Sequence, residues 1–299
     1  NFIFVITKEG ALRTLFTFYH GETMMQNFKD IDFNSIWQET MGWNISDKSG
    51  RKFDDQVESN FWVQLAPHYT KEYDLNKDTD LIADRLSALL GTDRTILEIG
   101  CGSGNFTALM ARYSRSILGL DFSPAMLAVL EERRLAEGIG NIRTQAGKWE
   151  DFTTDAVFDY IVSVNSLYRI RDMQKALLKM QAYSRCGFII IRTIQRPFFF
   201  DLYTQNSVAC AECPDYQLLP LLLWRSGIQA NVEFITYPKK KHFLNLADVS
   251  QEMQADLTAQ IFHEQQARLL QAFTGQAVFT DGRYTISQPR TTVIISVKK

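Results

Sequence analysis

The sequence has few cysteines, little net charge and no long hydrophobic run, and each shortage excludes a class of protein. Four cysteines are too few, in a chain of 299 residues, to form a disulfide framework. A formal net charge of −2 gives no basic footprint for DNA or RNA, so we expect no nucleic-acid partner. No stretch approaches the roughly 20 apolar residues that cross a bilayer, so we expect no membrane partner. With 45% hydrophobic residues, the composition predicts an ordinary globular protein of the cytoplasm.

The cysteines also offer little for a metal site. Cys210 and Cys213 have C-x-x-C spacing, which fits half of a zinc site or a redox pair. A tetrahedral zinc site needs two more ligands, yet there is no second C-x-x-C, and His242 and His263 are isolated in the sequence. We therefore expect no bound metal and interpret the two cysteines as free thiols in a loop.

The most informative segment is Thr95–Thr107, which begins as an apolar strand, passes through a glycine-rich turn and opens into a helix. A second apolar run, Ser116–Asp121, follows and ends in an acid. In such a unit the glycines let backbone N–H groups approach a nucleoside, and the acid binds the ribose hydroxyls. The segment therefore predicts a nucleoside site, although the same turn could serve only to pack a helix on a sheet.

The spacing of the glycines indicates which nucleoside is bound. The turn contains three of them, Gly100, Gly102 and Gly104. Position 105 is Asn, where a dinucleotide-binding loop carries its last glycine. With Glu98 two residues before the first glycine, the pattern E-x-G-x-G-x-G resembles motif I of the class I S-adenosylmethionine (SAM)-dependent methyltransferases of the small-molecule type. The resemblance implies that the turn, including Cys101, wraps the amino-acid tail of SAM, and that Glu98 helps to hold its ammonium group, directly or through water.

The resemblance extends to the ends of the following strands. It implies that Asp121 binds both ribose hydroxyls, that Phe122 lies beside the nucleoside, and that Met126 flanks the adenine. Val164–Tyr168 resembles motif IV, which lies beside the transferable methyl group, and it includes Asn165. These residues are therefore expected around the cofactor.

One departure concerns the adenine end of the site. The family often has an Asp after the third strand that meets the adenine amino group, but here Gly147 or Lys148 stands at that place. Glu150 could substitute from a shifted position, or Trp149 could stack on the adenine ring. We include Trp149 and Glu150 among the expected cofactor residues on this basis.

An aromatic segment precedes the glycine turn. Trp62, Ala66 and Tyr69 follow a W-x-x-x-A-x-x-Y pattern that, in many small-molecule methyltransferases, folds over the cofactor. The same spacing also fits a helix that packs its aromatic side chains on the sheet. The candidates for the acceptor pocket are Tyr69, Asn165, Tyr168 and His68, and we assign no catalytic base.

Alternating apolar strands and helices over Thr95–Ile194 predict an α/β fold with a doubly wound, mostly parallel sheet. The resemblance implies a Rossmann-like sheet of seven strands, in which the last strand, Thr291–Lys298, is antiparallel. It also implies an N-terminal helical segment and helical insertions that form a cap.

The chain divides into three expected parts. Residues 1–24 are expected to be a leader that is non-native or disordered, 25–90 a helical cap segment, and 91–299 the SAM-binding methyltransferase domain. Insertions are expected at about 195–213 and 245–281, where they could cover a substrate pocket. The second insertion contains a polar helical stretch around Gln251–Phe273.

Together these features predict an enzyme that transfers a methyl group from SAM to an oxygen, nitrogen or carbon nucleophile of a small-molecule acceptor. Transfer from a sulfonium is an in-line displacement that releases S-adenosylhomocysteine (SAH), so alignment is the main task of the protein. Two alternatives stay open: a non-catalytic SAM-binding or partner protein, and an NAD-dependent oxidoreductase, against which Asn105 argues. We expect a monomer or a homodimer.

Overall fold

The computed structural model describes residues 3–6, 12–15, 30–42, 51, 53–72, 77–210 and 212–299. Contacts within the chain divide it into two units, residues 1–32 and residues 33–299. In the first unit, β1 (Ile3–Ile6) pairs antiparallel with β2 (Leu12–Leu15). That residues 1–24 are a leader stays a prediction.

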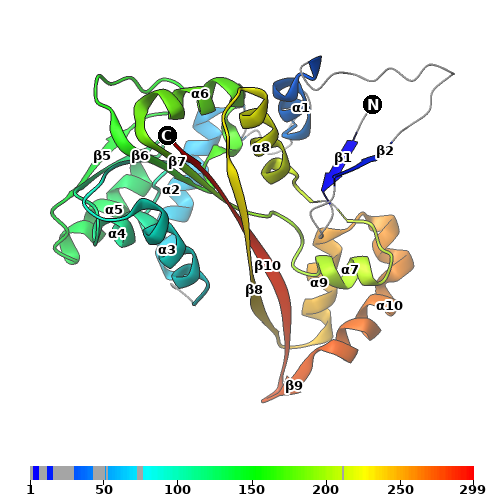
Figure 1. Ribbon diagram of the computed structural model, residues 1–299. Helices are drawn as coiled ribbons and strands as arrows, with labels where there is room; N and C mark the ends of the chain where they lie inside the picture. The colour runs from blue at the N-terminus through cyan, green and yellow to red at the C-terminus, as the bar shows by residue number, and fades with distance from the viewer. Residues whose placement is uncertain are drawn as a thin grey trace. The chain divides into compact units, whose positions relative to one another are not determined.

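The second unit is built on a sheet with the strand order β5-β4-β3-β6-β7-β10-β8 (Figure 1). Its strands are β3 (Thr95–Ile99), β4 (Ser116–Asp121), β5 (Ile142–Ala146), β6 (Phe158–Val164), β7 (Ser184–Thr193), β8 (Asn231–Phe243) and β10 (Arg283–Lys298). The five from β3 to β7 are parallel, and β10 runs antiparallel to both β7 and β8. A short strand, β9 (Val278–Thr280), pairs with β10. The predicted fold class, with its mostly parallel sheet and antiparallel last strand, is confirmed.

Helices cover both faces of this sheet. On one face lie α3 (Lys77–Leu90), α4 (Asn105–Ala111) and α5 (Pro124–Ala136), whose apolar side chains share a core with alternate residues of the strands. The other face carries α1 (Phe33–Thr40), α6 (Met173–Tyr183) and α8 (Asp215–Arg225), which contact one another. The two groups of helices stand on opposite sides of the sheet in Figure 1. None of the described helices is long and apolar enough to cross a bilayer.

The two segments expected as insertions contribute to one lobe, which we call the insertion lobe. It consists of α7 (Phe200–Gln205), α9 (Leu246–Asp256), α10 (Ala259–Gln276) and the distal parts of β8 and β10. These elements share a separate hydrophobic core around Phe199, Phe243 and Phe273, whose rings contact one another. The lobe therefore has its own core away from the sheet layers.

Two expectations about the insertion lobe were wrong in detail. The helical stretch expected around Gln251–Phe273 is two helices, because Thr258 accepts a hydrogen bond from the Ile261 N–H at 3.4 Å and starts α10 as its N-cap. The final strand was expected to begin at Thr291, but β8 and β10 continue to the pair Phe243 and Tyr284. Pro238 and Lys239–Lys241 look like a strand end in the sequence, but the two paired strands continue past them into the insertion lobe.

Candidate functional site

A cavity of about 360 Å³ lies where the parallel strands end, the place where ligands bind in sheets of this kind. Its walls come from α2 (Asp55–Glu72) and from the segments that follow β3, β4, β5 and β6. The predicted residues that line it are Gly100, Gly102, Asp121, Phe122, Met126, Trp149, Glu150, Asn165, Tyr69 and Tyr168. The cavity therefore gathers most of the residues expected from the sequence.

The glycine turn forms one wall through its backbone. Gly100, Gly102 and Gly104 all have positive φ, at 69°, 54° and 83°. A Cβ on Gly100 would lie 2.2 Å from Cβ of Ser166, and one on Gly104 would lie 2.2 Å from Cδ1 of Leu130. The left-handed φ and the close approach to Ser166 together favour glycine at Gly100, so the turn lies close to its neighbours. The N–H groups of Gly100 and Cys101 donate to the Leu120 carbonyl and that of Gly104 to the Cys101 carbonyl, which fixes the turn.

Asp121 lies at the end of β4 and contacts that turn. Its Oδ2 accepts the Gly102 N–H at 2.8 Å, and its Oδ1 accepts the Ser123 N–H at 2.8 Å. Each carboxylate oxygen has a further lone pair, so Asp121 can accept two more hydrogen bonds from the cavity. Burial raises the pKa of Asp121, and the two N–H donors oppose that rise. This arrangement suits a ligand with two adjacent hydroxyls.

Three predicted cofactor residues do not line the cavity: Glu98, which precedes the turn, and Cys101 and Gly104 within it. The Thr107 hydroxyl donates to Oε2 of Glu98 at 2.6 Å, and burial raises the pKa of Glu98 to about 8. Burial likewise raises the pKa of the Cys101 thiol. The structure thus places Glu98 as a support for the turn, and its contact with a ligand ammonium stays a prediction.

The adenine end expected from the sequence is formed by Phe122, Met126 and the segment after β5. Trp149 lines the cavity, but only 3% of it is exposed, and its indole N–H donates to the Ala176 carbonyl at 3.2 Å. Its ring also stacks on Phe152. The indole therefore packs mainly in the core, which argues against stacking of Trp149 on adenine.

The segment after β6 is held against two neighbouring strands. Asn165 has a φ of 54°, and its Oδ1 accepts the Thr193 N–H at 2.8 Å. The Ser166 hydroxyl donates to the Ile99 carbonyl at 2.5 Å. The Asn165 N–H also donates to the Ile191 carbonyl on β7, at 2.9 Å, so its contact with a ligand stays a prediction.

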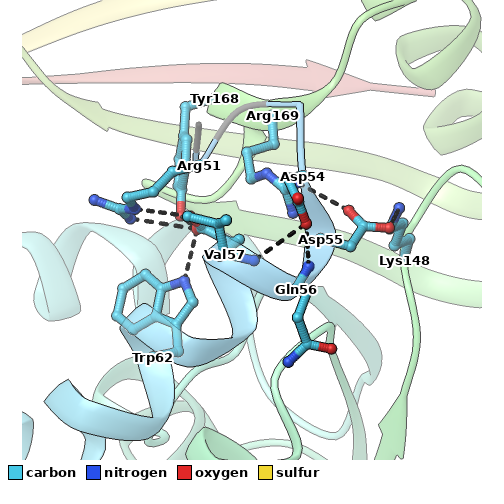
Figure 2. Close-up of polar contacts among 10 residues, drawn as sticks. Arg51, Asp54, Asp55, Gln56, Val57, Trp62, Lys148, Tyr168 and Arg169 are labelled. Carbon is cyan, nitrogen blue, oxygen red and sulfur yellow. Dashed lines mark hydrogen bonds and ion pairs between the residues drawn. The ribbon is translucent and has the colours of Figure 1, made fainter. Parts of the chain in front are cut away.

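The opposite wall comes from α2, which contributes Trp62 and Tyr69 of the predicted aromatic segment and also Asp55 and Glu58, which the sequence did not single out. Glu58 is 1% exposed and accepts hydrogen bonds from Arg51 Nε at 2.8 Å, Trp62 Nε1 at 2.7 Å and the Tyr168 hydroxyl at 2.8 Å (Figure 2). Burial raises the pKa of Glu58, but these donors outweigh it, so the pKa lies below its usual value. Burial and the nearby Glu58 raise the pKa of Tyr168. Glu58 thus joins α2 to Tyr168.

Asp55, one turn earlier on α2, forms ion pairs with Lys148 after β5 and with Arg169 after β6, the latter at 2.9 Å. The hydrogen bond from Lys148 is the main cause that lowers the pKa of Asp55. Lys148 and Arg169 both lie near the Phe122 ring, at 5.7 and 5.3 Å from its centroid. The three-residue spacing of Asp55 and Glu58 at a helix start was the only signal in the sequence for these contacts.

Tyr69, His68 and the insertion lobe were also expected near the acceptor pocket. Tyr69 lines the cavity, and its ring lies 5.7 Å from that of Trp62 in an edge-on contact. The side chain of His68 lies outside the described residues. The insertion lobe contributes none of the cavity's lining among the residues described, so its role as a cover for the pocket stays a prediction. In the described part of the chain, no cluster of His, Cys, Asp and Glu could hold a metal ion.

Comparison with known proteins adds a family. The family model described as "Methyltransferase domain" matches residues 90–266. Among curated proteins, an uncharacterised protein of Haemophilus influenzae is 27% identical over 148 residues, 48% of this chain and 54% of the relative. A malonyl-[acyl-carrier protein] O-methyltransferase of Paenibacillus is 28% identical over 155 residues, 50% of this chain and 55% of the relative. The chain thus spans about half the length of these relatives.

Among solved structures, the N-methyltransferase NodS of Bradyrhizobium japonicum in complex with SAH superposes with a TM-score of 0.43 at 14% identity. The superposition covers 89% of this chain and 98% of that one.

Proposed function

Because the family model spans residues 90–266, the chain belongs to the methyltransferase-domain family, and we propose that it methylates a small molecule with SAM. Membership confirms the family expected from the Thr95–Thr107 segment. The acceptor nucleophile is an oxygen, nitrogen or carbon atom. The observation that carries the proposal is the pairing of Asp121 with the glycine turn at one cavity wall.

The described residues fit the nucleoside part of SAM. Asp121 keeps an accepting position on each carboxylate oxygen, which suits the two ribose hydroxyls. Gly100 and Gly102 line the cavity without a side chain, so the turn presents its backbone there. Phe122 and Met126 supply apolar surface beside Asp121 for the base. When bound, the cofactor supplies a methyl group on a positively charged sulfur.

The protein's part in such a reaction is mainly alignment and exclusion of water. The wall around Tyr69, Trp62 and Tyr168 is aromatic, so it suits an acceptor with an apolar body. The Tyr168 hydroxyl donates a hydrogen bond to Glu58, so its oxygen lone pairs stay available at the cavity. They can accept a hydrogen bond from an N–H or O–H of the methyl-accepting molecule. This places the acceptor beside the segment after β6.

Calorimetry with SAM, SAH and NAD tests the proposal. We expect one SAH or SAM per chain and no heat with NAD. The variant Asp121→Asn should weaken SAH binding about ten- to a hundredfold, because an amide nitrogen replaces one accepting oxygen. Asp93→Asn is the matched control, since it removes the same charge from an exposed pair with Arg115 outside the cavity. Binding of NAD in preference to SAH would overturn the proposal.

Activity is then tested by incubating the protein with methyl-labelled SAM and a panel of small-molecule alcohols, amines, carboxylic acids and activated carbon nucleophiles. We expect label in one chemical class of the panel and release of SAH. SAH binding without transfer to any fraction of a whole metabolite extract would favour the non-catalytic binding protein.

A further inference from the structure

The first turn of α2 lies outside the part of the chain matched by the family model, yet it completes the cavity wall. Asp55 and Glu58 are three residues apart, so their side chains lie on the same face of the helix. Asp55 pairs with Lys148 and Arg169, which follow β5 and β6 (Figure 2). Glu58 accepts a hydrogen bond from Tyr168, which also follows β6. The turn is therefore attached to the domain by two carboxylates, and they differ in strength.

Glu58 is the firm attachment. Its carboxylate is 1% exposed and accepts hydrogen bonds from Arg51, Trp62 and Tyr168. Opening its contact with Tyr168 would break a hydrogen bond to a buried carboxylate, which is costly because bonds to charged groups are stronger than neutral ones. Glu58 and Tyr168 therefore stay together while other contacts of α2 break.

Asp55 is the weak attachment. Its side chain is 49% exposed, and those of Lys148 and Arg169 are 34% and 17% exposed. Ion pairs of this exposure contribute little to stability and are screened by salt, so they open readily. Their position matters, however, because Lys148 and Arg169 lie beside Phe122, next to Asp121. The weak attachment thus spans the nucleoside end of the cavity.

We propose that Asp55 is a latch, which closes the first turn of α2 over the Phe122 end of the cavity while Glu58 acts as the pivot. Breaking the pairs with Lys148 and Arg169 opens the nucleoside end, and re-forming them closes it after a ligand has entered. The wall around Tyr168 keeps its geometry throughout, because the pivot does not move. The latch rests on the proposed function, in that the ligand it admits is the cofactor.

The latch is tested by the rates of SAH binding, followed by stopped-flow tryptophan fluorescence at increasing salt. Asp55→Asn keeps the side-chain shape and removes the charge. We expect it to raise the association and the dissociation rate constants together by about three- to tenfold, with a much smaller change in Kd. Salt should accelerate exchange in the wild type and have little effect in this variant.

Asp54→Asn is the matched control. Asp54 is the neighbouring acid, and its Oδ1 accepts the N–H groups of Gln56 and Val57 at 2.8 and 3.2 Å. Asn caps a helix as well as Asp does, so this variant loses the same charge but keeps the helix start and the latch. We expect wild-type rates and wild-type salt dependence for Asp54→Asn.

The outcomes separate the two proposals. SAH binding whose rates are the same in the wild type and in Asp55→Asn overturns the latch alone. Equal acceleration in Asp54→Asn and Asp55→Asn also overturns it, because a general charge effect would then explain the rates. A wild-type protein that binds no SAH overturns the proposed function and the latch together.

Discussion

The two walls of the cavity are built in different ways. The glycine wall, Gly100–Gly104 with Asp121, depends on backbone conformation and on contacts between segments that are close in sequence. The α2 wall depends on side-chain pairs between distant segments, such as Glu58 with Tyr168, 110 positions apart. The first wall is fixed by steric limits on the backbone, whereas the second is held by polar contacts that can break singly. Under our two proposals, the glycine wall binds the cofactor and the α2 wall controls its entry.

The sharpest way to break the glycine wall is Gly100→Ala. The new Cβ would lie 2.2 Å from Cβ of Ser166, at a φ of 69° that favours glycine. We expect a loss of about 3 to 5 kcal/mol in the free energy of unfolding, from overpacking and backbone strain together. Urea denaturation measures it, and SAH affinity should fall as well.

Gly138→Ala isolates the backbone part of that effect. Gly138 has a φ of 66°, but nothing lies within 4 Å of the added Cβ. We expect a loss of about 1 to 2 kcal/mol and unchanged SAH affinity. If the two alanine variants were equally stable, close packing of the glycine turn would not be the reason for Gly100.

The α2 wall is broken most directly by Glu58→Gln. The change removes the charge that Arg51 pairs with, and the amide nitrogen replaces either Oε2, the acceptor of Arg51 Nε, or Oε1, the shared acceptor of Trp62 and Tyr168. We therefore expect a loss of about 3 kcal/mol in the free energy of unfolding. Tyr168→Phe removes only one donor and should cost about 1 kcal/mol. Thermal unfolding of both variants checks this order. If Glu58→Gln left the stability unchanged, Glu58 would not be the firm attachment.

The support behind the glycine wall gives an effect that depends on pH. Because burial raises the pKa of Glu98 to about 8 from 4.5, Glu98 stays protonated in the folded chain while it ionises in the unfolded chain. The unfolded state therefore binds fewer protons between about pH 5 and pH 8, so stability falls as the pH rises through this window.

Glu98→Gln removes that loss and keeps an acceptor for Thr107. The stability of the variant relative to the wild type should increase with pH by up to about 1.4 kcal/mol per unit, measured by urea denaturation from pH 5 to pH 8. Glu132→Gln, an exposed site on α5, should show no such trend. A flat difference for Glu98→Gln would mean that Glu98 is ionised in the folded chain.

The contrast between the walls also explains what the sequence could predict. Gly100–Gly104 and Asp121 were found because strand ends and glycine spacing are local patterns, and the parallel strands bring them together. Asp55, Glu58, Lys148 and Arg169 were not linked in advance, because their pairing depends on how α2 docks on the sheet. The sequence marked Lys148 only because the family often has an Asp near that position. The structure shows that Lys148 forms an ion pair with Asp55.

The form of the insertion lobe was not predicted from the sequence. Its helices were expected from insertion length and polar helical patterns, but a shared core around Phe199, Phe243 and Phe273 joins two insertions that are far apart in sequence. No local pattern shows such a contact. The extension of β8 and β10 was missed for the same reason. Lys239–Lys241 looks like a solvated strand end in the sequence, but the pairing of β8 with β10 continues through it into the insertion lobe.

Hydrogen exchange on SAH binding tests the central claim, that one ligand lies between the two walls, most directly. We predict increased protection of amides in Gly100–Gly104, in Asp121–Met126 and in the first turn of α2, with no change in α10 of the insertion lobe. Protection confined to the insertion lobe, or absent from Gly100–Gly104 at saturating SAH, would contradict the account.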